Sequence, residues 1–300
     1  MQINFTQVEA LLRSFLTRAE FGYPAPCPEA DAKLYKLAIE ESIRRGINKN
    51  HENTKPYFGP ILFNAAQYTN TSYAHLSPDL QMIMCIITAC LTYIDDAPHH
   101  GYIWDDVAKF QHRFVHNEAH PNTVLMACDC LLKEMYQYFG ETEANLVVTS
   151  AVNVSTAVLF EKLEMKATES SYADFYRDIS GAPDLYAVFI FPKNLPLSTY
   201  IQAIPDLRII INQVNDILSF YKEEKAGDNT NYISFLAESL QISKLEALQV
   251  AVDKAIAAHQ NIMRILSPSR EAIECYQKFN HGYMAYHIHG ERYKLEELGF

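Results

Sequence analysis

The 300-residue sequence is poor in glycine and in positive charge. It has only 10 glycines and no long run in which apolar and polar residues alternate with a period of two. The scarcity of glycine and the absence of this alternation both disfavour a β-rich fold, because hairpins depend on glycine turns and exposed strands depend on the alternation. Lysine and arginine number 25 against 36 acidic residues, a formal net charge of −11. This charge argues against a general nucleic-acid-binding protein but not against an anionic substrate, since bound Mg²⁺ reverses the local field.

The sequence contains no CxxC pair, although it has six cysteines. Several lie within apolar helical patterns, so reduced cysteines in a core are expected, which fits a cytoplasmic protein. The N-terminus MQINFTQVEALLRSFL is amphipathic and carries Glu9, so it does not resemble a secretory signal. The longest apolar run, Met82 to Ile94, is interrupted by Thr88 and Thr92 and is too short to span a bilayer. The sequence therefore predicts no membrane-spanning segment.

Helical periodicity extends over most of the chain. Prolines at 24, 26 and 28 mark one turn, and residues 51–60, with Pro56 and Gly59-Pro60, read as a loop. Pro205 is expected to kink or divide the segment 197–223. The predicted helices cover 5–18, 29–46, 61–70, 79–95, 103–115, 121–139, 141–165, 171–180, 184–191, 197–223, 230–239, 243–266 and 268–289. With 49% hydrophobic residues, no repeat and no linker, this pattern predicts one all-α domain over 1–300, roughly a dozen helices around a central cavity.

One nine-residue run carries the clearest chemical signal. Asn215, Ser219 and Glu223 are spaced i, i+4, i+8 in the run Asn-Asp-Ile-Leu-Ser-Phe-Tyr-Lys-Glu. On a helix these side chains share one face, and all three offer hard oxygen ligands of the kind that Mg²⁺ prefers. Lys222 stands beside them, where it could meet an anion held by the same metal. The apolar residues between them indicate that the face looks into a dry interior.

Three weaker signals lie elsewhere. The pair Asp95-Asp96 ends an apolar helix, and its alternative interpretation is a solvated helix end. Arg177 precedes a break at Gly181; it could bind phosphate oxygens bidentately or form an ordinary ion pair. The dipeptide Arg292-Tyr293 could donate to the same anion or simply lie on the surface.

Together and in this order, these four segments resemble the class I terpene cyclases. The resemblance is strongest to the fungal trichodiene synthase-like branch, runs from about residue 60 to the C-terminus, and is specific only in the motif segments. It implies an all-α terpenoid-synthase bundle and a Mg²⁺-dependent enzyme of fungal secondary metabolism. The implied reaction ionises farnesyl diphosphate, cyclises the carbocation to a sesquiterpene and releases diphosphate. A homodimer would fit the resemblance, but the sequence shows no interface.

The resemblance also assigns roles to residues. It implies three Mg²⁺ ions, with Asp95 as bridging ligand, Asp96 beside it, and Asn215, Ser219 and Glu223 around the third ion. Arg177, Lys222, Arg292 and Tyr293 are implied to bind the diphosphate. The family usually has another acid three or four residues after the aspartate pair, but Pro98, His99 and His100 stand there instead. Histidine is a poor ligand for Mg²⁺.

Aromatic residues that flank the motifs are expected to line the cavity and stabilise carbocations, namely Phe63, Tyr93 and Tyr286. His281, His287 and His289 invite an acid–base interpretation, but structural roles are preferred because released diphosphate can serve as the final base. Two alternatives stay open. A chain-elongating prenyltransferase would carry two aspartate-rich motifs, and a non-catalytic helical protein of the same fold would bind substrate without releasing diphosphate. The product and a C10 or C20 substrate are also left open.

Overall fold

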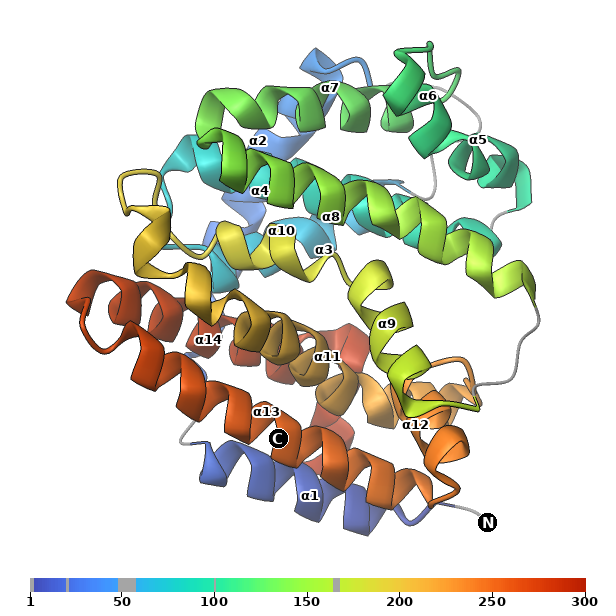
Figure 1. The fold of residues 1–300 in the computed structure, drawn as a ribbon, viewed down its shortest axis with the longest axis vertical. Coiled ribbons are helices and arrows are strands. Elements are labelled where there is room, and N and C mark those ends of the chain that lie inside the picture. The colour runs from blue at the N-terminus through green and yellow to red at the C-terminus, as the bar shows by residue number, and fades with distance from the viewer. Residues whose placement is uncertain (1–2, 20–21, 48–57, 100, 164–167) are drawn as a thin grey trace. The chain divides into compact units, whose positions relative to one another are not determined.

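The computed structural model describes residues 3–19, 22–47, 58–99, 101–163 and 168–300, and every regular element in these ranges is helical (Figure 1). The α-helices are α1 (Phe5–Arg18), α2 (Pro28–Arg44), α3 (Phe58–Ser72), α4 (Pro78–Asp95), α5 (Trp104–Ala108), α6 (Phe110–His116), α7 (Thr123–Tyr138), α8 (Glu141–Phe160), α9 (Ser170–Ser180), α10 (Pro183–Val188), α11 (Ile204–Ala226), α12 (Tyr232–Leu240), α13 (Lys244–Leu266) and α14 (Arg270–His289). Short 3-10 helices lie between several of them. The predicted all-α class is confirmed.

Local sequence explains most helix boundaries. Pro205 lies in the first turn of α11, where a missing N–H costs nothing, so the 197–223 segment divides before it, as predicted. The side chains of Asn122 and Asn231 accept backbone N–H groups at the starts of α7 and α12. Ser243 and Glu246 form a reciprocal capping box at α13. α11 ends at Gly227, whose φ of 75° gives the left-handed cap that glycine adopts without strain.

Several predicted boundaries were wrong: the predicted helices 141–165 and 184–191 end earlier, at Phe160 and Val188, and the helix predicted over 197–223 spans Ile204–Ala226. Helix α3 begins at Phe58 rather than residue 61, because Gly59 and Pro60 occupy its first turn, where proline is tolerated. The remainder of the predicted loop, 51–57, lies outside the described residues. The predicted helix 103–115 is two helices, which part at Lys109. No proline or glycine marks this break; it directs Phe110 into the core, where its exposed fraction is 0%.

The chain divides into two compact units. The first comprises Met1–Pro26, Met165–Pro183 and Leu195–Phe300, and the second comprises Cys27–Glu164 and Asp184–Asn194. The prediction of one domain over 1–300 stays a prediction, and each unit is considered by itself.

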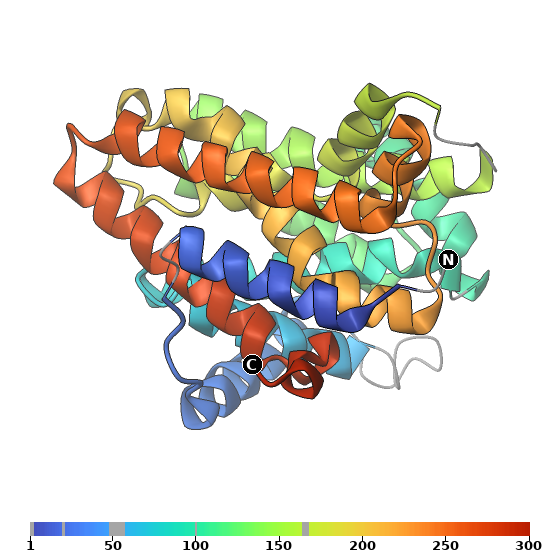
Figure 2. The same cartoon turned by 90° about the horizontal axis from the view of Figure 1, so that it is seen from below.

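The first unit is built around α11. This helix packs against α13, α14, α1, α12 and α9, and α1 also lies along α13 (Figures 1 and 2). Its apolar residues point into this packing, with Ile210, Val214, Ile217 and Phe220 fully buried. The apolar side of the Asn215–Glu223 run is therefore buried, and the expectation that its ligand face looks into a dry interior stays a prediction.

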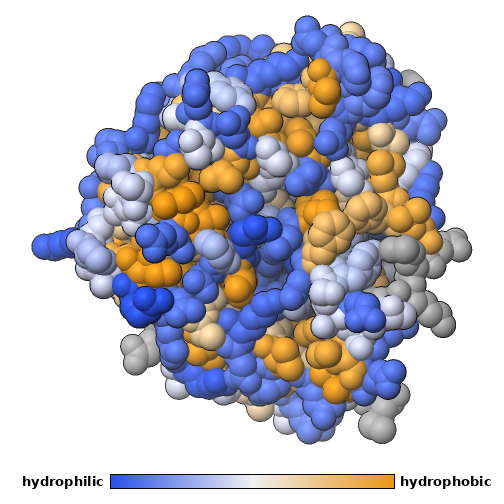
Figure 3. Space-filling model, viewed as in Figure 1, coloured by the Kyte–Doolittle hydropathy of each residue, from blue (hydrophilic) through white to orange (hydrophobic). Residues whose placement is uncertain are grey.

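The second unit is built around α4, which is buried along most of its length and packs on α2, α3, α7 and α8. Among the described residues, one stretch, Glu141–Leu163, is long and apolar enough to cross a membrane by length and composition. Half of its apolar 18-residue portion is buried. It contains α8, which packs on α4, α5, α6 and α7 like a core helix. The surface in Figure 3 shows hydrophobic patches separated by hydrophilic side chains.

Candidate active site

The predicted ligand residues of the first unit share one continuous helix. Asn215, Ser219 and Glu223 all lie within α11, so the i, i+4, i+8 spacing does place them along one face. Ser219 is only 1% exposed, whereas the side chain of Glu223 is 18% exposed. The face thus runs from the half-buried Asn215 amide through the buried Ser219 hydroxyl to the partly exposed carboxylate of Glu223.

Two buried oxygens next to this face have no hydrogen-bond partner in the described part of the chain. They are Ser219 Oγ and Asp216 Oδ2. An unsatisfied buried polar atom costs about 1–3 kcal/mol, so a ligand that met these two oxygens would recover that cost. A hydroxyl, an amide oxygen and a carboxylate fit a hard cation such as Mg²⁺. The residues present therefore fit the metal that the sequence predicts.

Arg177 reaches this face from the last turns of α9. Its Nε donates to Asp216 Oδ1 at 2.7 Å, and its Nη2 donates to Asn215 Oδ1 at 3.0 Å. Burial raises the pKa of Asp216 to about 7, and the Arg177 charge opposes that rise. The arginine predicted to bind phosphate oxygens therefore contacts a predicted metal ligand.

The chain breaks immediately after α9, as predicted. A Cβ atom at Gly181 would lie 2.3 Å from Asn212 Oδ1 and 2.8 Å from Arg177 Nη1, so glycine is required for this approach. The next residue, Ala182, is buried with a φ of 46°, an uncommon conformation for a residue with a side chain. The break is therefore a built feature that sets where Arg177 lies.

Asn215 is also held from its other side. Its Nδ2 lies 3.1 Å from His287 Nε2 on α14, and His287 Nδ1 lies 2.8 Å from the carbonyl oxygen of Tyr283. Complete burial lowers the pKa of His287 to about 3, so its ring is neutral. The structural interpretation of His287 is thereby supported.

The other predicted anion-binding groups gather near Tyr293. Lys222 Nζ and Arg292 Cζ each lie 5.4 Å from the centre of the Tyr293 ring, and the Tyr286 ring lies 5.6 Å from it, edge on. Tyr293 is buried, and burial raises its pKa, so its phenol keeps its proton and can donate. Arg292 is exposed.

The residues after Tyr293 are held by hydrogen bonds and ion pairs to α11 and α1 of the same unit. Tyr221 donates to Glu297 Oε2 at 2.7 Å, and Lys225 pairs with the same carboxylate. Arg13 on α1 donates to the carbonyl oxygens of Leu298 and Gly299 at 3.1 and 3.0 Å.

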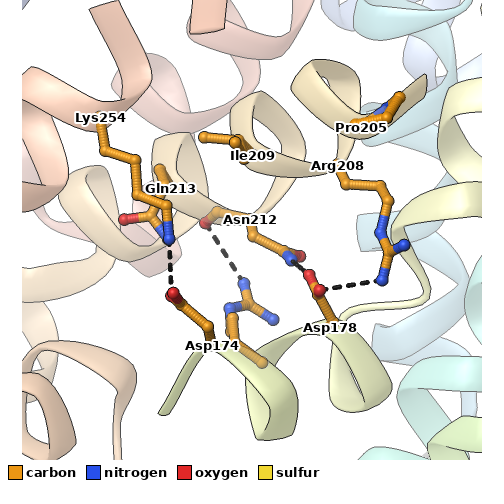
Figure 4. A pocket seen from close by; sticks show the side chains of 9 residues that line it. Asp174, Asp178, Pro205, Arg208, Ile209, Asn212, Gln213 and Lys254 are labelled. Carbon is orange, nitrogen blue, oxygen red and sulfur yellow. Dashed lines mark hydrogen bonds and ion pairs between the residues drawn. The ribbon is translucent and has the colours of Figure 1, made fainter. Parts of the chain in front are cut away.

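A cavity of about 320 Å³ opens between α9, α11 and α13, with Arg177 in its wall (Figure 4). Asp178 accepts from Arg208 and from Asn212 at 2.9 Å each, and Lys254 pairs with Asp174 at 2.6 Å. Burial raises the pKa of Asp178. These contacts join the three helices that position Arg177.

In the second unit, Asp95 is the last residue of α4 and is exposed, while Asp96 caps the helix. The partial negative charge at a helix C-terminus disfavours a carboxylate there, so a cation beside Asp95 would be stabilising. The backbone N–H of His99 donates to the carbonyl oxygen of Asp96 at 3.0 Å. His100 lies outside the described residues.

The two predicted cavity aromatics of this unit differ in exposure. Tyr93 is fully buried, and its hydroxyl accepts from Asn122 Nδ2 at 2.8 Å. Phe63 is 38% exposed and contacts Tyr35 edge on, with ring centres 5.3 Å apart. Their role as cavity wall stays a prediction.

Sequence reasoning missed the roles of Asp216 and Asn212 beside the α11 face. Asp216 holds Arg177, and Asn212 approaches Gly181 and bonds to Asp178. A signal was present, because both are polar residues among apolar residues of the helix. For His287 a structural role was expected, but its contact with Asn215, 72 residues away, had no local signal.

The fold is that of the class I terpene synthases. A linalool/nerolidol synthase from Streptomyces clavuligerus matches 90% of this chain and 98% of its own, with a TM-score of 0.65 and 11% identity. A hedycaryol synthase matches 89% of this chain and 97% of its own, with a TM-score of 0.63 and 16% identity.

The sequence narrows this class further. The profile of the Trichodiene synthase (TRI5) family matches residues 61–299, and the chain belongs to that family. An alpha-cuprenene synthase from Coprinopsis cinerea is 32% identical over 98% of this chain and 91% of its own. A longiborneol synthase from Gibberella zeae is 31% identical over 77% and 71%. The protein is thus a terpene synthase, and the alternatives of a prenyltransferase and a non-catalytic protein are set aside.

Proposed function

We propose that this terpene synthase is a Mg²⁺-dependent sesquiterpene synthase that ionises farnesyl diphosphate, cyclises the carbocation and releases diphosphate. The observation that carries the proposal is the α11 face, where a buried Ser219 hydroxyl with no hydrogen-bond partner among the described residues lies between Asn215 and Glu223, with Arg177 against Asn215. Relatives named for C15 chemistry, such as an (E)-beta farnesene synthase from Metarhizium brunneum at 29% identity over 88% of this chain, favour the C15 substrate.

Asn215, Ser219 and Glu223 would hold one Mg²⁺ ion, and Asp95, with Asp96 beside it, would hold the others of three. Bound Mg²⁺ supplies positive charge that stabilises the diphosphate as it leaves. Pro98 and His99 in place of an acid leave this role chiefly to Asp95.

Arg177, Lys222, Arg292 and Tyr293 would donate hydrogen bonds to the diphosphate. Each acts most strongly as negative charge builds on the leaving group, which is the condition for lowering a barrier rather than merely binding. A phosphate oxygen would compete with Asn215 for Arg177 and so free Asn215 Oδ1, which accepts from that arginine. The buried Tyr293 phenol keeps its proton for the same purpose.

The allylic cation must then be kept from water. Phe63, Tyr93 and Tyr286 would contribute aromatic faces, which stabilise carbocations as they do other cations. We retain a cytoplasmic location as part of the proposal, and a homodimer as its proposed assembly.

The test is incubation of the purified protein with Mg²⁺ and farnesyl diphosphate, followed by mass spectrometry of the extracted products and assay of diphosphate. We expect a C15 hydrocarbon or alcohol and stoichiometric diphosphate, and neither without Mg²⁺. Formation of a longer prenyl diphosphate when isopentenyl diphosphate is added would contradict the proposal.

A C10 substrate is the second candidate. A relative named monoterpene synthase 25, from Postia placenta, is 27% identical over 98% of this chain and 88% of its own. Comparing kcat/KM for geranyl and farnesyl diphosphate decides between them. A higher value for geranyl diphosphate would assign the protein to C10 chemistry.

A further inference from the structure

We infer that His287 is a positioning residue that fixes which atom of the Asn215 amide faces the metal site. The inference rests on the proposed function, because it takes Asn215 as a metal ligand. It starts from the contact between His287 Nε2 and Asn215 Nδ2, 3.1 Å apart and joining α14 to α11.

The donors and acceptors around Asn215 allow only one arrangement. Arginine can only donate, so the Asn215 atom that Arg177 Nη2 approaches at 3.0 Å must be the oxygen. The atom that faces His287 is then the NH₂ group, and His287 Nε2 must accept from it. On the far side of the ring, Nδ1 faces the carbonyl oxygen of Tyr283 at 2.8 Å and must carry the proton. Both ends of the chain of hydrogen bonds therefore require the same tautomer.

The ring cannot easily turn away from this arrangement. His287 is fully buried, with the ring centres of Tyr283 and Tyr293 4.5 Å from its own and that of Tyr286 at 5.3 Å. Tyr283 is fixed in turn, because its hydroxyl donates to the carbonyl oxygen of Ile211 at 2.9 Å.

Two hydrogen bonds join α14 to α11, one helical turn apart. Tyr283 meets Ile211, and four residues later in both helices His287 meets Asn215. Ser219 lies one further turn along α11. Helix α14 ends at His289, before the position that would supply a third such hydrogen bond. Ser219 Oγ accordingly has no partner in the described residues. The contacts between α14 and α11 thus orient the predicted ligand Asn215 and do not reach the predicted ligand Ser219.

Without His287 the amide loses the acceptor for its Nδ2 atom. It could then rotate and present NH₂, which cannot bind a cation, or form alternative hydrogen bonds. Removing a residue that orients a metal ligand typically weakens metal binding or activity by roughly 10- to 100-fold. A structural role confined to packing would weaken stability without acting selectively on metal binding.

Two variants of the same position separate the two hydrogen bonds. In His287→Asn the short amide can still donate to the Tyr283 carbonyl but does not reach Asn215. In His287→Gln the longer amide places an oxygen where Nε2 stood, so it can accept from Asn215, and it gives up the bond to Tyr283. Both substitutions put a neutral amide into the same buried place, which makes them matched controls for packing.

The measurement is the affinity for Mn²⁺, an oxygen-binding substitute for Mg²⁺ that electron paramagnetic resonance detects, in the presence of inorganic diphosphate and without prenyl substrate. We expect binding about 10-fold weaker in His287→Asn and within about 3-fold of the unmodified protein in His287→Gln. Equal losses in both variants, or no loss in His287→Asn, would overturn the inference. Thermal unfolding is measured without metal to check that both variants fold.

The failure of this inference can be told from failure of the proposed function. Asn215→Ala is measured in the same assay and is expected to bind Mn²⁺ more weakly still. Unchanged binding by Asn215→Ala would overturn the metal assignment and this inference with it. A loss in Asn215→Ala together with unchanged binding in His287→Asn would overturn only the positioning role.

The tautomer of His287 can also be measured directly in the unmodified protein. Nitrogen chemical shifts of ¹⁵N-histidine-labelled protein report which ring nitrogen carries the proton, and the His287 signal is identified by its loss in His287→Gln. We expect a neutral ring protonated at Nδ1. A proton on Nε2 would overturn the inference, because that atom would then need the Asn215 oxygen as its acceptor.

Discussion

The two predicted metal-binding segments are built differently. On α11 the residues lie within one continuous helix that is packed in the first unit, and Asn215 is held from both sides by Arg177 and His287. On α4 the carboxylate of Asp95 is exposed at the end of the helix, where the helix charge disfavours it. The difference teaches that the α11 segment places its ligands within a packed helix, whereas the Asp95 segment places a carboxylate at an exposed helix end, where a bound cation would offset the charge of that end.

The largest effect is expected for the α11 segment. Asn215→Ala and Glu223→Ala each remove a hard oxygen ligand, so we expect turnover to fall by about 100-fold or more. Steady-state kinetics with farnesyl diphosphate measure the loss, and circular dichroism should show an unchanged helix content. Glu238→Ala, an exposed acid on α12, is the control and should keep full activity. Full activity in either motif variant would refute the metal assignment.

The next effect ranks the two aspartates of the other segment. Asp95→Ala should lower turnover by about 100-fold, because a ligand that neutralises diphosphate charge through Mg²⁺ is lost. Asp96→Ala should cost about 10-fold, as expected of a residue that supports a ligand. Turnover measured over a range of Mg²⁺ concentrations gives the ranking. The reverse order of the two variants would show that the ligand was assigned to the wrong aspartate.

A smaller effect is expected from glycine substitutions near each segment. Gly181→Ala places a Cβ atom 2.3 Å from Asn212 Oδ1, so Asn212 or Arg177 must shift. We expect a stability loss of about 1–3 kcal/mol, measured by denaturant unfolding, and a lower kcat. Gly101→Ala, near the Asp95 segment, meets nothing within 4 Å and should change neither quantity much. Equal stability and equal kcat in the two variants would contradict the tighter packing assigned to Gly181 than to Gly101.

The smallest effect concerns the start of a helix in each unit. Ser243 accepts from the backbone N–H of Glu246 in the capping box of α13, and Ser243→Ala should cost about 1 kcal/mol. Ser77 precedes α4 without a side-chain capping bond, so Ser77→Ala should cost only a few tenths of a kcal/mol. Urea unfolding of the two variants compares them. A larger cost at Ser77 would contradict the assigned capping geometry.

Local patterns in the sequence predicted the parts of the site that depend on local geometry. Helical spacing placed Asn215, Ser219 and Glu223 on one face, because the period of a helix is fixed. Proline chemistry likewise predicted a kink or a division of the 197–223 segment at Pro205, and α11 begins next to it at Ile204. These predictions needed no knowledge of tertiary packing.

Contacts distant along the chain could not be predicted in this way. The bonds of Arg177 to Asp216 and of His287 to Asn215 join residues 39 and 72 positions apart, so they depend on how helices pack. The break at Lys109 and the positive φ of Ala182 carry no signal in residue type either. In both cases tertiary packing overrides the local preference of the chain.

The anchoring of the C-terminus limits how Arg292 and Tyr293 can move. His287 fixes the chain before this pair, and Glu297, bound by Tyr221 and Lys225, fixes it afterwards. Any swing of Arg292 toward a substrate is therefore that of a short segment attached at both ends.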